Sequence, residues 1–118
     1  EIPLNRNRGP IAQAEAKRKT AEARFLALQS TIQGEIDIAL ASYQASRAKA
    51  TTAAQLAQEA ASSSATTRRM VEAGQVSALE LTRRQIEAST ANVALLGAQI
   101  EAQTAAGALE DAMQASLH

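Results

Sequence analysis

The chain of 118 residues lacks cysteine and tryptophan, and it has one Phe, one Tyr, one His and two Pro. Without cysteine, and with its single histidine at position 118, it cannot assemble a thiolate or multi-imidazole metal site. Leu, Ile, Val and Phe together make only 22 residues, which is few for an ordinary globular core. This scarcity of large apolar and aromatic side chains argues against a sheet domain.

An excess of one charge and long hydrophobic runs are also absent. Twelve basic residues balance twelve acidic ones, so we expect no general attraction to nucleic acid. The basic run Lys17-Arg18-Lys19 is interleaved with Glu15 and Glu22, which favours a solvated helix face. No run approaches the roughly 20 apolar residues of a membrane-spanning helix. The serine run at positions 62–64 has no base arranged around it, so we expect no enzyme and no cofactor.

Alanine is the abundant residue, with 29 copies, and it is the best helix former. We predict an all-α chain made of a long antiparallel hairpin, coiled-coil-like, with four segments. Residues 1–9 form an extended lead-in because Pro3 disfavours helix before it, and residues 10–73 form a long helix that begins with Pro10 in its first turn. Residues 74–77 form a turn, and residues 78–116 form the second helix.

The turn carries several helix-end signals. Gly74 is placed as a left-handed cap of the first helix. Ser77 followed three residues later by Glu80 predicts a capping box, and Val76 with Leu81 predicts the hydrophobic staple around it. A turn this short makes the two helices antiparallel neighbours.

The two arms of the hairpin are unequal in length. If Ala73 lies opposite Ala78, the end of the second helix near Ser116 lies opposite about Glu35. Residues 10–34 then extend without a partner from this chain, although they carry large apolar side chains that need cover: Ile11, Phe25, Leu26, Leu28 and Ile32. We therefore expect the isolated chain to form a dimer or a higher homo-oligomer.

The second helix has two apolar rows with a seven-residue period. One row is Leu79, Ile86, Val93 and Ile100; the other is Leu81, Ala88, Leu95, Ala102 and Leu109. The rows start two residues apart, about 200° around a helix, which predicts neighbours on both sides. The first helix has two less regular rows of this kind: Phe25, Ile32 and Ala39, and Ile36, Tyr43, Ala50 and Ala57.

Two segments resemble the outer membrane efflux proteins, the TolC-like channels, in their second internal repeat. The segment from Ile2 to Ile11 is similar to the place where a barrel strand of that family ends and its long helix begins. The segment from Glu72 to Leu81 resembles the family's Glu-Ala-Gly-x-x-Ser-x-Leu-Asp-Val-Leu stretch. The resemblance covers nearly the whole chain. The family's usual aromatic between Leu4 and Asn5 is missing here.

The resemblance implies a location and partners. The family forms homotrimers in the cell outer membrane, and its helical tunnel crosses the periplasm toward a periplasmic adaptor and an inner-membrane pump that export drugs or metal ions. This chain would be tunnel wall in the periplasm, as a fragment of a channel protomer. Its turn would be the tip that docks the adaptor, through Gly74, Gln75, Val76 and Ser77.

Charged residues near the turn suggest ion pairs or a gate at the tip: Arg69, Glu72, Glu80, Arg83 and Arg84. Glu80 also fits the capping box, and Arg83 stands where some family members carry an acid, which argues against a carboxylate ring. Two rival interpretations stay open. One is a free-standing coiled-coil oligomerisation protein with a structural role, and the other is the helical hairpin of an adaptor, which normally has arms of similar length.

Overall fold

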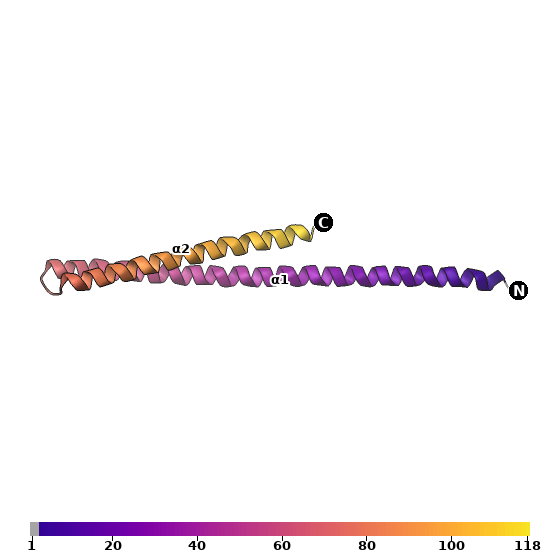
Figure 1. The fold of residues 1–118 in the computed structure, drawn as a ribbon, viewed down its shortest axis with the longest axis horizontal. Helices are drawn as coiled ribbons and strands as arrows, with labels where there is room; N and C mark the ends of the chain where they lie inside the picture. The colour runs from indigo at the N-terminus through magenta and orange to yellow at the C-terminus, as the bar shows by residue number, and fades with distance from the viewer. Residues whose placement is uncertain (1–2) are drawn as a thin grey trace.

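The computed structural model describes the backbone of residues 3–118 and the side chains of residues 8–118. It contains two helices, α1 (Pro3–Glu72) and α2 (Ala78–Ala115), which pack against each other as an antiparallel hairpin (Figure 1). The molecule is a rod of 111 × 17 × 14 Å. The predicted all-α hairpin with unequal arms is confirmed.

The start of α1 differs from the prediction. The helix begins at Pro3 and continues through Pro10, so the predicted extended lead-in over residues 1–9 is wrong for residues 3–9, while residues 1 and 2 lie outside the described residues. A proline at the first helical position lacks only an N–H that has no partner there, and Pro3 gives this signal as well as Pro10 does. Pro10 lies inside the helix, where it cannot donate a hydrogen bond to the carbonyl of Arg6.

The seam between the helices follows a seven-residue repeat on both of them. On α1 most of the less exposed residues recur at alternating steps of about four and three: Ile32, Ile36, Ala39, Tyr43, Ser46, Ala50, Ala53, Ala57, Ala60, Ser64, Thr67 and Val71. On α2 they are Leu81, Arg84, Ala88, Ala91, Leu95, Ala98, Ala102, Ala105, Leu109 and Ala112. This is the spacing of a coiled coil. The two rows predicted on the first helix therefore form one face, because a step of four residues turns a helix by only about 40°.

Small side chains fill most of the seam. Ala98 is 3% exposed, Ala57 is 6% exposed and Thr67 is 7% exposed, and no other side chain among residues 8–118 is as deeply buried. Alanine lets the two backbones approach closely, but it removes little apolar area from water. The hairpin thus depends on many small contacts along its length.

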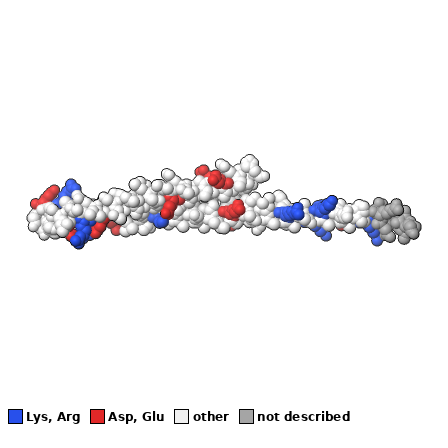
Figure 2. All heavy atoms as spheres, in the orientation of Figure 1, with Lys and Arg blue, Asp and Glu red and all other residues white. Residues whose placement is uncertain are grey.

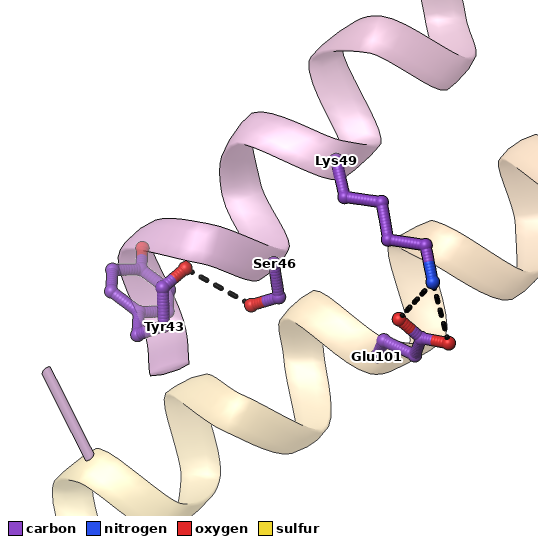
Figure 3. Close-up of polar contacts among 4 residues, drawn as sticks. All are labelled: Tyr43, Ser46, Lys49 and Glu101. Atoms are coloured by element: carbon purple, nitrogen blue, oxygen red, sulfur yellow. Dashed lines mark hydrogen bonds and ion pairs between the residues drawn. The ribbon is translucent and has the colours of Figure 1, made fainter. Parts of the chain in front are cut away.

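Among the side chains of residues 8–118, one ion pair joins the two helices. The Lys49 Nζ lies 2.9 Å from one carboxylate oxygen of Glu101 and 3.2 Å from the other (Figure 3). Nearby, the Ser46 hydroxyl donates a hydrogen bond of 3.0 Å to the Tyr43 carbonyl, and the Arg47 guanidinium lies 5.8 Å from the Tyr43 ring centroid. Lys49 and Glu101 each precede a seam residue, so the pair marks one side of the seam.

The N-terminal part of α1 extends beyond the end of α2 (Figure 1). Ser116 and His118 line a shallow hollow together with Ile32, Gln33 and Ile36, which confirms that α2 ends opposite the predicted part of α1. We call residues 8–32 the overhang. Figure 2 shows basic side chains along it and acidic side chains gathered where α2 ends.

No helix in the described part of the chain is long and apolar enough to cross a membrane.

Candidate functional site

The tip of the hairpin is a compact turn closed by backbone hydrogen bonds. Gly74 has a φ of +76°, in the left-handed region. Its N–H donates to the Val71 carbonyl at 3.0 Å, and the N–H of Gln75 donates to the Met70 carbonyl at 2.8 Å. These two bonds form a Schellman motif, which satisfies the last carbonyl groups of α1. The prediction that Gly74 caps the helix in a left-handed conformation is confirmed.

The start of α2 differs from the predicted capping box. Ser77 occupies the N-cap position with an extended backbone, but its side chain makes no capping hydrogen bond. The Glu80 N–H instead donates to the Ser77 backbone carbonyl at 3.1 Å. The Glu80 carboxylate lies 3.2 Å from the Arg84 guanidinium, one turn along α2. The charge of Arg84 explains why this carboxylate does not fold back to the N-cap, because charge-assisted hydrogen bonds are stronger than neutral ones.

The structure brings together only part of the predicted charge cluster. Arg84 contacts Glu80 and also Glu87, again at 3.2 Å, so both ion pairs lie within α2. Within residues 8–118, no ion pair shorter than 4.0 Å involves the other three predicted members, Arg69, Glu72 and Arg83. Arg69 instead approaches the Thr66 hydroxyl at 3.4 Å. The predicted tip ion pairs are therefore wrong for those three residues, and no ion pair among the described side chains joins the two helices at the tip.

A shallow depression lies beneath the turn. It is lined by residues of both helices and of the turn: Thr67, Met70, Val76, Ser77, Glu80 and Arg84. Thr67 and Met70 were not predicted as tip residues. The signal for Thr67 was available, because it stands seven residues after Ala60 on the seam row of α1. Met70 is 39% exposed and gives the depression an apolar wall beside Val76.

A second surface feature runs along α2 on the face opposite the seam. Leu79, Ile86, Val93 and Ile100 are between 62% and 70% exposed, whereas the row that contains Leu81 and Leu95 lies in the seam. We call these four residues the outer row. The two rows predicted on opposite sides of α2 are confirmed as opposite, and among the described residues only the row with Leu81 and Leu95 packs against a partner helix.

Within residues 8–118, no group of three His, Asp or Glu side chains is arranged to hold a metal ion. The tip consists of a turn closed by backbone hydrogen bonds, an apolar wall formed by Met70 and Val76, and charged side chains beside it.

Comparison with protein-family models, with curated proteins and with solved structures finds no match for this chain.

Proposed function

We propose that this chain forms wall and tip of the periplasmic helical tunnel of an outer membrane efflux channel of the TolC-like kind. The observation that carries the proposal is the outer row of α2. A two-helix coiled coil needs one apolar row on each helix. A second seven-residue row of large apolar side chains, 62–70% exposed on the opposite face, suits a helix with neighbours on both sides. A closed wall of side-by-side helices provides such neighbours.

The dimensions and the sequence motifs support the same role. A rod of 111 Å with unequal arms suits a conduit that spans a wide compartment. The segments from Ile2 to Ile11 and from Glu72 to Leu81 resemble the two ends of the long helix in that family. In this role the parent protein is a homotrimer in the outer membrane, and this segment lies in the periplasm. Exported substrates would be drugs or metal ions.

The tip provides the proposed docking surface for a periplasmic adaptor. The Schellman turn holds Gln75 and Val76 at the extreme end of the rod, where a partner can reach them. The intrahelical pairs of Arg84 leave no ion pair joining the two arms among the described tip side chains. Ion pairs between the two helices of one hairpin therefore do not close the tip. In the proposed channel, contacts between neighbouring hairpins would control whether the periplasmic end is open.

The test begins with the coding sequence on both sides of these residues. The proposal expects strand-forming segments and an upstream second copy of the helix-turn-helix unit. In cells that lack the gene, the full-length gene should restore resistance to exported compounds, and Val93→Glu in the outer row should abolish that rescue. The matched control is Thr90→Glu, which adds the same charge to an exposed position of α2 outside the row. Equal rescue by both variants would contradict the wall role.

An alternative is a free-standing coiled-coil protein that self-associates in a structural role. The exposed apolar side chains of the overhang favour it, because Phe25 and Leu28 are 66% and 59% exposed and need cover in any setting. A coding sequence that ends on both sides of the hairpin would select this alternative.

A further inference from the structure

The overhang has an apolar stripe with basic edges. Small and large apolar residues share one face of the helix because they are spaced by seven, four, three and four positions: Ala14, Ala21, Phe25, Leu28 and Ile32. Lys17 and Arg24 lie along one edge of this stripe. Counted over residues 8–32, five basic residues stand against two acidic ones, a net charge of +3. The overhang is therefore an amphipathic, basic helix, and among the described residues only the end of α2 approaches it, at the hollow lined by Phe25, Leu28 and Ile32.

The adjoining end of the hairpin has the opposite charge. Residues 33–46 and 105–118 contain four carboxylates and no lysine or arginine: Glu35, Asp37, Glu110 and Asp111. Figure 2 shows acidic side chains near the end of α2, followed along the rod by the basic side chains of the overhang. The rod thus carries two neighbouring sections of opposite charge. Its charge distribution is therefore complementary to that of a second copy in the antiparallel orientation.

One side of this acidic section also carries two exposed apolar side chains. Leu40 and Met113 each follow a seam residue, so they lie on the side of the seam opposite the Lys49–Glu101 pair. They are 41% and 50% exposed. Asp37 and Glu110 lie one turn before them on the same side of the hairpin. We call these residues, Asp37, Leu40, Glu110 and Met113, the acidic face.

We propose that a second copy of this chain docks antiparallel on the first, with the overhang stripe of each copy lying on the acidic face of the other. The two-fold axis passes midway between overhang and acidic section, near Ser30. The hollows at the two α2 ends, lined by Phe25, Leu28, Ile32 and Ile36, then face each other at the centre. A two-fold arrangement covers both overhangs at once and forms a closed dimer. A staggered parallel arrangement would leave one overhang uncovered and could continue as an open polymer.

Electrostatics distinguishes this arrangement from the simplest competitor. In an end-to-end dimer the two overhangs would pair with each other, which places a net charge of +3 beside another +3. Docking on the acidic face places +3 beside the two carboxylates of that face, Asp37 and Glu110, within a section that has no lysine or arginine. Because exposed charges are screened by salt, the proposed dimer should weaken as NaCl is raised from about 50 mM to about 500 mM, and the end-to-end dimer should tighten. The association does not depend on the proposed channel role.

The test uses sedimentation equilibrium of the full chain and two charge-reversal variants. Lys17→Glu with Arg24→Glu reverses the edge of the stripe, and Asp37→Lys with Glu110→Lys reverses the acidic face. Each variant alone should raise the dimer dissociation constant by about tenfold or more, since every substitution acts twice in a two-fold dimer. Mixed together, the two variants should form a heterodimer of near-native affinity, because both docking sites are then attractive again.

Two control substitutions and a cysteine cross-linking measurement test the proposed dimer further. Lys19→Glu lies on the opposite face of the overhang and Glu59→Lys lies beyond the acidic section, so both should leave the dissociation constant unchanged within about twofold. In this cysteine-free chain, Ala21→Cys on one copy should cross-link to Leu40→Cys on another, because the two-fold axis near Ser30 places these positions opposite each other. A monomer at all concentrations up to hundreds of micromolar, equal effects of variants and controls, or cross-linking of Ala21→Cys only to itself would overturn the proposal.

Discussion

Gly74 is the residue on which the shape of the hairpin most directly depends. Its φ of +76° is strained for any residue with a Cβ, and a Cβ added there would meet no atom within 4 Å. Gly74→Ala should therefore lower the free energy of unfolding by about 1–2 kcal/mol through the backbone alone. Gly97→Ala is the matched control, since it lies in the interior of α2 with the same open surroundings and should raise stability by up to about 1 kcal/mol. Urea denaturation measures both, and a loss of stability in both variants would contradict this account.

The Lys49–Glu101 pair should contribute little to stability although it marks one side of the seam. Both side chains are more than half exposed, at 64% and 56%. A double-mutant cycle with Lys49→Met and Glu101→Gln should give a coupling free energy of about 0.2–1 kcal/mol that falls in high salt. Thermal unfolding at low and high ionic strength checks this. A coupling that persists unchanged in molar salt would mean that the pair is not screened as an exposed contact should be.

Residue types predicted some parts of the tip and missed others. The left-handed conformation of Gly74 could be predicted from the residue type, because few residues other than glycine adopt that conformation. The capping box failed because its acid, Glu80, had a competing cation one turn along in Arg84. A spacing pattern states which bonds are possible, whereas the choice among them depends on side-chain positions. The predicted pairs of Glu72 and Arg83 are not formed among the described side chains, and their positions near the turn did not reveal this.

At the scale of the helices, the seam is the feature that sets how close α1 and α2 can lie. Ala98 is 3% exposed, so a larger side chain there has no free volume to occupy. Ala98→Leu should separate the helices locally and lower the free energy of unfolding by about 1–3 kcal/mol. Ala94→Leu makes the same change on an exposed position of α2 and should alter stability by less than about 0.5 kcal/mol. Chemical denaturation of the two variants compares them, and equal values would show that the seam has room to adapt.

The helices were largely predictable from periodicity, and the arrangement of their faces was not. Both apolar rows of α2 repeat every seven residues, so periodicity alone gives no reason to prefer the Leu81 row over the Leu79 row for the seam. The structure places the Leu81 row in the seam and leaves the Leu79 row exposed, a choice that depends on the packing against α1 and not on the repeat of α2 alone. The start of α1 was misjudged because Pro3 and Pro10 give the same helix-start signal, and propensity alone does not choose between them.

At the scale of the whole molecule, the rod should contain two regions of different stability. Amides of residues 8–24 belong to a part of the overhang that packs against no other helix among the described residues, whereas those of residues 40–72 belong to the coiled coil. In dilute solution, overhang amides should exchange with deuterium much faster, because isolated helices are marginal in water. Raising the protein concentration should slow exchange in the overhang while leaving residues 50–72 unchanged, since the proposed dimer covers the overhang and not the tip. Exchange that is slow in the overhang at every concentration would require a helix strengthened by its own side chains. The single ion pair described there, Arg18–Glu22 at 3.9 Å, is too exposed and too long to provide that strength.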